Sequence, residues 1–140
     1  MKPTLIHRRV LTAARSMVWG SFAMLAAGSA LADTPQSFLA DYAQQAGAPG
    51  NASRGQQFFT SRHGGQWSCA SCHGQQPTQD GRHASTGKVI SPLAPAANPQ
   101  RFTDSRKVEK WFRRNCGDVL DRECSAQEKA DVLAWLNALR

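Results

Sequence analysis

Apolar residues recur at helical spacing in four stretches of the chain, and no stretch alternates apolar and polar residues as a half-buried strand would. The first stretch covers residues 37–46. The second starts at Asn51 or Ser53, either of which is a suitable N-cap, and ends at the glycine-containing residues 63–65. The pattern therefore predicts two helices in the first half of the domain.

The second half of the chain predicts two more helices. One begins at Thr103 or Asp104 and reaches Asn115, where Gly117 is a plausible stop. Four of its residues fall at positions i, i+3, i+4 and i+7 and so share one face: Val108, Trp111, Phe112 and Asn115. The other helix follows the capping box formed by residues 125–128. Its apolar residues are Val132, Leu133, Trp135, Leu136 and Leu139.

The segment between the two pairs of helices is polar. Residues 74–101 are rich in Gly, Pro, Ser and Gln and hold too few apolar residues to pack on themselves. We expect a long loop that wraps a prosthetic group. The fold class predicted is a small all-α domain with long loops.

The N-terminus has the features of an export signal. Four basic residues come first: Lys2, Arg8, Arg9 and Arg15. Residues 16–32 carry no charge, a run shorter than the about 20 residues of a membrane span. Residues 30–32 are the small-x-small sequence Ala-Leu-Ala, which predicts cleavage before Asp33. We expect a signal peptide over 1–32, a domain over 33–140 in the periplasm, and no membrane insertion after cleavage; an uncleaved anchor is the alternative.

Cleavage changes the charge balance. The whole chain has a net charge of +7, but the signal holds four of the 17 Lys and Arg and none of the ten acidic residues. The mature chain would carry +3, and it shows no basic stripe with interleaved aromatic residues. Nucleic-acid binding is therefore not expected.

Residues 69–73 form a C-x-x-C-H sequence, the attachment signature of a c-type haem. Cys69 and Cys72 lie one turn apart and can reach two vinyl groups, while His73 can bind the iron from one side. A zinc site would need further ligands at knuckle spacing, and thioredoxin-like chemistry would need a βαβ context. Neither is found in the sequence, so we expect one covalent haem c.

The second axial position of that iron is unusual. The chain's three Met are Met1, Met17 and Met24, all within the expected signal, so no thioether is available to the mature protein. The two cysteines outside the haem motif, Cys116 and Cys124, are expected to form a disulfide in an oxidising compartment, with free thiols as the alternative.

The mature chain resembles the class I cytochromes c. Gly55 and Phe59 match the G-x-x-x-F sequence of the helix before the haem, and residues 135–136 match the aromatic-Leu pair of the terminal helix. In that family these two helices cross closely, which implies that Gly55 admits the opposing aromatic ring. The family also implies that the Pro92 carbonyl accepts a hydrogen bond from His73. Candidates for holding the haem propionates are Trp67, Arg82, Lys88 and Arg101.

Residues 107–136 and 85–93 are similar to the sphaeroides haem protein (SHP) group of high-spin cytochromes c. In that group an Asn next to a disulfide cysteine ligates the oxidised iron and leaves on reduction. This implies that Asn115 is the distal ligand and that dioxygen or nitric oxide binds the reduced iron. The resemblance also implies an electron donor, a dihaem cytochrome c or a membrane cytochrome b.

Other functions stay open at this point. Without the resemblance, hydrogen bonds to loose carbonyls at the end of its helix explain Asn115 better than iron ligation does. An ordinary six-coordinate electron carrier would use His63 or His83, the only other histidines after residue 32. A haem domain that senses a ligand and alters a partner surface is a third class. Catalysis is undecided, because no acid–base pair or substrate is evident.

Overall fold

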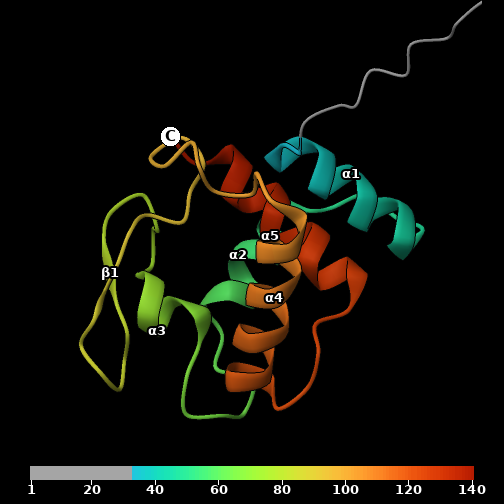
Figure 1. Cartoon of the computed structure of the whole chain (residues 1–140). Helices are drawn as coiled ribbons and strands as arrows, with labels where there is room; N and C mark the ends of the chain where they lie inside the picture. The colour runs from blue at the N-terminus through green and yellow to red at the C-terminus, as the bar shows by residue number, and fades with distance from the viewer. Residues whose placement is uncertain (1–32) are drawn as a thin grey trace, which may run out of the picture. The chain divides into compact units, whose positions relative to one another are not determined.

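The structure is a computed structural model, and it describes residues 33–140. The expected signal peptide, residues 1–32, lies outside the described part. Five helices and one two-stranded sheet follow in chain order (Figure 1): α1 (Pro35–Ala46), α2 (Ala52–Thr60), α3 (Cys69–His73), β1 (Gly81–Arg82), β2 (Val89–Ile90), α4 (Ser105–Leu120) and α5 (Ala126–Ala138). The predicted all-α class is confirmed. None of these helices has the length and apolar character needed to cross a membrane.

The helix starts follow from local capping. Thr34 forms a capping box with Ser37, and Pro35 opens α1, two residues earlier than its apolar pattern predicts. Asn51 caps α2 by accepting a hydrogen bond from the backbone of Arg54. The predicted capping box of α5 forms between Ser125 and Glu128.

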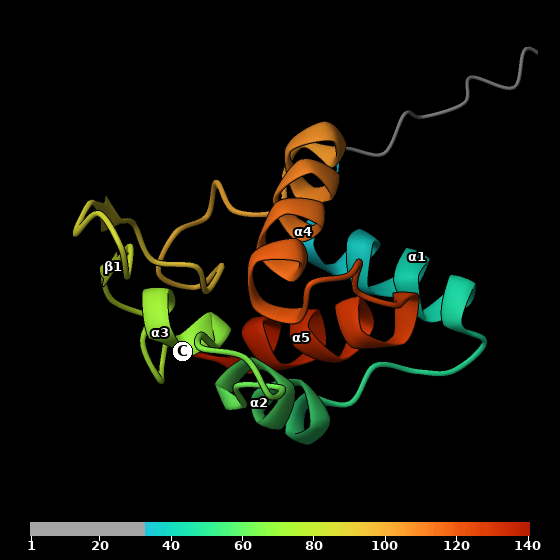
Figure 2. The same ribbon diagram turned by 90° about the horizontal axis from the view of Figure 1, so that it is seen from below.

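Helix α5 lies between α1 and α2 and packs closely against both (Figure 2). One core cluster joins α1, α4 and α5 through the buried residues Phe38, Tyr42, Val108, Ala130 and Leu133. A second joins α2, α3 and α5 through Phe59, Ala70, Val132, Trp135 and Leu136. The haem motif is thus attached to the second cluster, because Ala70 lies inside it.

The expected close crossing of α2 and α5 is confirmed, but the role of its glycine differs from the expectation. A Cβ atom on Gly55 would overlap the backbone carbonyl of Asp131 and approach the amide nitrogen of Val132 to 2.9 Å. The ring of Trp135 packs instead on Phe59, with the ring centroids 4.9 Å apart. Gly55 therefore admits the opposing backbone, and the aromatic ring lies one turn farther along α2.

Helix α4 is held mainly by side chains. The most extensive backbone contacts between the described elements join α2 to α5, α1 to α5, α2 to α3, α3 to β1 and β1 to β2, and α4 is not among these pairs. Phe112 meets Tyr42 edge to face at 5.7 Å, and the Tyr42 hydroxyl donates a hydrogen bond to Glu109. Glu109 also pairs with Lys129 of α5 at 2.9 Å. These contacts anchor the first half of α4.

The expected end of α4 at Gly117 is wrong. The helix continues to Leu120, and Asp121 closes it in the left-handed conformation, with φ 55° and its amide bonded to the Gly117 carbonyl. A Cβ on Gly117 would meet no atom within 4 Å, so this glycine lies on the open side of the helix and does not interrupt it.

The loop over residues 74–101 contains the antiparallel β1–β2 pair, in which Gly81 faces Ile90 and Arg82 faces Val89. The apolar pattern predicted no strand here, because two residues on each side are too short to alternate visibly. Gly81 explains the position of the pair: a Cβ on it would overlap the carbonyl oxygen of Cys72. The pair therefore lies directly against α3.

A buried carboxylate joins the start of α2 to α5. Asp131 is 5% exposed and accepts hydrogen bonds from the Asn51 amide at 2.7 Å, from Gln127 at 3.0 Å and from Arg54 at 2.7 and 2.8 Å. Burial alone would raise the pKa of Asp131, but the Arg54, Asn51 and Gln127 donors outweigh it and lower the pKa below its usual range.

We expect Asp131→Asn to destabilise the haem-loaded protein by about 1–3 kcal/mol at pH 7, because charged hydrogen bonds are lost in a buried place. A lowered folded-state pKa gives stability that is complete above the unfolded value of about 3.9 and decreases as the pH falls through the folded value. The variant should therefore lose less stability than the wild type on acidification. Urea unfolding at pH 7 and at a series of lower pH values measures both the destabilisation and its dependence on pH. Asp118→Asn, an exposed carboxylate on α4, is the control, and equal pH curves for the two variants would contradict this role.

Candidate functional site

Helix α3 carries the C-x-x-C-H sequence on little more than one turn. Ser68 caps it in a reciprocal capping box with Ser71, and Gly74 ends it at φ 80°. The thiols of Cys69 and Cys72 are both free. Because the two cysteines are separated by three positions on a helix, their side chains project from the same face of α3.

His73, at the end of α3, lies against the second core cluster. Its ring centroid is 6.1 Å from that of Phe59. Burial, assisted by the positive charge of Arg101, lowers the pKa of His73 to about 4. The imidazole is therefore neutral at pH 7, the form in which a ring nitrogen can bind a metal.

The Cys69 thiol does not resemble that of a redox-active C-x-x-C. Burial raises the pKa of Cys69 to about 11, whereas thiol–disulfide enzymes lower it to stabilise the thiolate. The motif also lies on a short helix outside any βαβ unit. Among residues 33–140 the structure shows no group of three or more His, Cys, Asp and Glu side chains placed to hold a metal ion.

The loop after α3 returns to it twice. The backbone amide of Ala84 approaches the Cys72 sulfur at 3.3 Å, beside the glycine contact of β1 described above. Farther along, Arg101 donates hydrogen bonds to the Ser91 carbonyl at 2.6 Å and to the Pro92 carbonyl at 2.8 Å. These bonds fold the far end of the loop onto itself and hold Arg101 where its charge acts on His73.

The expected bond from His73 to Pro92 is not the one the structure forms. The Pro92 carbonyl accepts from Arg101 and, at 3.3 Å, from Asn98. Three of the candidates for holding the haem propionates are cations. Arg82 donates a hydrogen bond to the Gly87 carbonyl at 3.4 Å, and Lys88 is exposed. Arg101 is the half-buried cation of this set, and its charge acts on His73.

Asn115 lies in the second half of α4 and is half-buried. Within residues 33–140 its carboxamide forms no hydrogen bond with the protein, so the alternative of bonding loose carbonyls at a helix end is not what the structure shows. One turn before it, Trp111 is 47% exposed, although Val108 and Phe112 on the adjoining face pack into the core.

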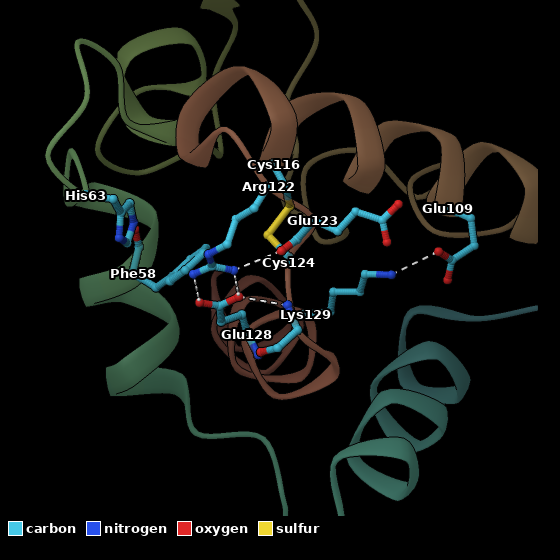
Figure 3. Close-up of a disulfide and its surroundings, with 10 residues drawn as sticks. Phe58, His63, Glu109, Cys116, Arg122, Glu123, Cys124, Glu128 and Lys129 are labelled. Atoms are coloured by element: carbon cyan, nitrogen blue, oxygen red, sulfur yellow. Dashed lines mark hydrogen bonds and ion pairs between the residues drawn. A yellow bond between two sulfur atoms is a disulfide. The ribbon is translucent and has the colours of Figure 1, made fainter.

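The predicted disulfide between Cys116 and Cys124 is confirmed, with Cα atoms 5.6 Å apart. It joins α4 to the connection that leads into α5 (Figure 3). Cys116 follows Asn115 directly in the sequence. Arg122 ties the same connection a second time, because it bonds both carboxylate oxygens of Glu128, at 2.6 and 2.8 Å. Glu128 in turn accepts from the Ser125 amide at 2.8 Å. The residue beside Asn115 is thus fixed covalently, and the connection that follows it is fixed by an ion pair as well.

The two histidines that could serve a conventional electron carrier have local partners. His63 follows α2 with φ 53°, and its Nε2 lies 2.7 Å from the Phe58 carbonyl, with the two rings 4.5 Å apart (Figure 3). His83 starts the β1–β2 turn, where its Nδ1 accepts from the Thr86 amide at 3.3 Å.

The residues present fit a covalently attached haem. Two free thiols one turn apart and a neutral, half-buried imidazole at the next position are the donor set that thioether attachment and iron ligation need. Cys69, Cys72 and His73 would hold the group from α3. Gly81 keeps the β pair close to this helix, a contribution that the sequence alone did not reveal.

Comparison with known proteins supports the same conclusion. Residues 45–136 match a family described as a domain of unknown function (DUF1924). The cytochrome c-type protein SHP of Cereibacter sphaeroides is 52% identical over 118 residues, which cover 80% of this chain and 91% of that protein. Cytochrome c'' of Methylophilus methylotrophus is 46% identical over 78 residues, 56% of this chain and 54% of that protein.

Solved structures agree. Oxidised SHP, described as an oxygen-binding cytochrome c, superposes with a TM-score of 0.72 at 48% identity, covering 77% of this chain and 99% of that one. Oxidised cytochrome c'' gives a TM-score of 0.67 at 34% identity, covering 76% and 94%. The chain therefore belongs to the DUF1924 family and is an SHP-type cytochrome c that carries one covalent haem c.

Proposed function

We propose that this protein is a periplasmic, high-spin haem protein that binds a diatomic molecule when reduced. Cys69 and Cys72 attach the haem, and His73 is the proximal ligand. Asn115 is the distal ligand of the ferric iron and leaves it on reduction. The observation that carries the proposal is Asn115 itself. Its carboxamide is half-buried, has no hydrogen-bond partner among residues 33–140, and stands next to a disulfide cysteine in a chain without Met after residue 24.

The ligand exchange has a simple chemical basis. The haem supplies an iron that changes its charge by one and can accept a sixth ligand. The amide oxygen or nitrogen of Asn115 is a hard, weak donor that suits ferric iron better than ferrous iron. Dioxygen and nitric oxide are π-acceptors that prefer ferrous iron. Asn115 therefore blocks the site in one redox state and frees it in the other.

Two observations support the proposal: a relative is described as oxygen-binding, and the histidines that could replace Asn115 at the iron have other partners. The SHP structure is described as that of an oxygen-binding cytochrome c. A six-coordinate carrier would use His63 or His83, and these are bonded to Phe58 and Thr86. The electron that opens the site comes, in this proposal, from another cytochrome, either a dihaem cytochrome c or a membrane cytochrome b.

The periplasmic location rests on two features. Residues 1–32 have the composition of an export signal, and a disulfide joins Cys116 to Cys124 in the mature part. Disulfides persist in the bacterial periplasm and are rare in the cytosol. Intact-mass measurement of periplasmic material checks the location and the cleavage of the signal at once. A chain that begins near Asp33 with one haem added is the expected result.

Asn115→Ala is the direct test of the gate. We expect the ferric iron of this variant to become five-coordinate or water-ligated, with a changed absorption spectrum and faster binding of cyanide and azide. Carbon monoxide should bind the ferrous variant at nearly the wild-type rate, because Asn115 has already left the iron in that state. Asn115→Met should act in the opposite sense, raising the reduction potential and slowing carbon monoxide, since sulfur favours ferrous iron.

The matched variants are His63→Ala and His83→Ala. Both should leave the ferric spectrum unchanged. A changed ferric spectrum in either histidine variant, together with an unchanged one in Asn115→Ala, would overturn the assignment and favour the ordinary electron carrier. A ferrous wild-type protein that is low-spin and does not respond to carbon monoxide would have the same meaning.

A further inference from the structure

The positive charge of the described chain is concentrated on one helix. Residues 33–140 hold 13 Lys and Arg against ten Asp and Glu, and α4 holds five of the former and two of the latter. Its net charge of +3 thus equals that of the whole described part, and the remaining residues balance. The five basic residues of α4 are all exposed and are called the basic face below: Arg106, Lys107, Lys110, Arg113 and Arg114.

This arrangement does not serve the stability of the helix. Arg106 and Lys107 stand in the first turn of α4, where the helix dipole is positive and favours acidic residues, and that turn holds none. Lys110 follows Arg106 and precedes Arg114 by four positions, so like charges face one another across successive turns. Each effect is small, but both have the same unfavourable sign.

Few of these charges are neutralised within the described chain. Lys107 is 3.6 Å from Asp104, and Arg113 is 3.9 Å from Glu123, both in exposed positions. Of the two acidic residues of the helix, Glu109 is bonded to Tyr42 and Lys129, and Asp118, four positions after Arg114, forms no ion pair within residues 33–140. Among residues 33–140, no ion pair includes Arg106, Lys110 or Arg114.

The basic face also has a defined place relative to the proposed gate. Val108, Phe112 and Cys116 turn to the interior, so the basic residues lie on the opposite, outward side of α4. Between the basic face and Asn115 lies the exposed ring of Trp111. The Lys110 ammonium and the Arg114 guanidinium stand 5.7 and 5.8 Å from that ring.

We propose that the basic face of α4 is the docking surface for the protein that delivers the electron, and that this donor presents a carboxylate-rich surface. The inference rests on the proposed function, because a gate opened by reduction needs a donor close to the haem. The unpaired positive charges of the basic face destabilise α4 on its own, but they would attract the carboxylates of an approaching donor. Such complementarity raises association rates by one to three orders of magnitude at low salt.

A gold electrode coated with a carboxylate-terminated monolayer tests the proposal, since it presents carboxylates and delivers electrons. The haem-loaded Arg106→Gln/Lys110→Gln protein should bind this surface at least about fivefold more weakly than the wild type at low ionic strength. Near 1 M salt, where the screening length falls to about 3 Å, the two proteins should behave alike. The control is Arg62→Gln/Arg140→Gln, which removes the same charge from exposed residues elsewhere. Its affinity should change less than about twofold.

Three outcomes would overturn the docking surface. Equal losses in the two double variants would mean that only net charge matters. A changed haem content or ferric spectrum in the α4 variant would assign its cations to the haem carboxylates. The third outcome concerns vesicles of phosphatidylglycerol at about 0.15 M salt. If the wild type bound them and only the α4 variant failed to bind, the partner of the basic face would be a membrane surface. Failure of the gate is separate, because it is seen in the ferric spectrum of Asn115→Ala and not at the electrode.

Discussion

Gly55→Ala is expected to destabilise the haem-loaded protein by about 3 kcal/mol or more, at the upper end of the range for overpacked interiors. The added Cβ would overlap the Asp131 carbonyl, which is backbone and cannot rotate away as a side chain can. Helix α2 would have to move off α5, and Phe59 would move with it, away from Trp135 and His73. Urea unfolding measures the loss, and the yield of covalently attached haem should fall with it.

Gly117→Ala is the matched control for the same substitution in a helix. A Cβ there meets no atom within 4 Å, so the change should add about 0.5–1 kcal/mol of stability by removing a glycine from the interior of α4. If the free energy of unfolding of Gly55→Ala lay within about 0.5 kcal/mol of the wild-type value, the tight crossing of α2 and α5 would be contradicted.

Removal of the disulfide is expected to have the second-largest effect. Cys116 and Cys124 are eight positions apart, and closing so short a loop contributes about 2.5 kcal/mol in the chain-entropy description. Cys116→Ser/Cys124→Ser should therefore unfold at lower denaturant. It should also bind cyanide faster in the ferric state although Asn115 is retained, because the turn that carries this residue is no longer fixed to α5.

Arg122→Gln distinguishes the contribution of the ion pair from that of the disulfide. It removes the ion pair to Glu128 but leaves the covalent bond, and we expect a much smaller change in both stability and cyanide binding. Thiol counting on the denatured, unreduced wild type should find no free thiol at Cys116 or Cys124. Two free thiols, or a serine double variant with wild-type cyanide kinetics, would contradict the bracing role.

The starts of α2, α4 and α5 were predictable because their signals are local. Asn51, Asp104 and Ser125 each cap the backbone three residues ahead, so the sequence around each contains the information. The start of α1 was placed two residues too late, because its apolar pattern begins after the Thr34 cap. The end of α4 was not predictable in this way. Gly117 has the residue type of a stop, but the helix ends where Asp121 takes a left-handed conformation beside a connection that the disulfide closes.

The candidate site also has a part that local sequence predicted and a part that depends on contacts between separate elements. Cys69, Cys72 and His73 are contiguous, and their spacing alone indicated covalent haem. The function of Gly81 depends on a contact with α3, and that of Gly55 on one with α5, both between separate elements. For Pro92, the family resemblance implied a bond from His73, whereas its carbonyl accepts a hydrogen bond from Arg101 at the end of the same loop. No periodicity within a single stretch of sequence reveals such long-range contacts.

The anchoring of α4 has a consequence for how this domain can change over evolution. The helix is fixed near its start by Phe112, Tyr42 and Glu109, and near its end by the disulfide, while Asn115 belongs to neither core cluster. A substitution at this position leaves both anchors in place. In the proposed site the residue that blocks or frees the iron is thus separable from the residues that keep the protein folded. New ligand chemistry can then arise by a single codon change without a compensating change in the core.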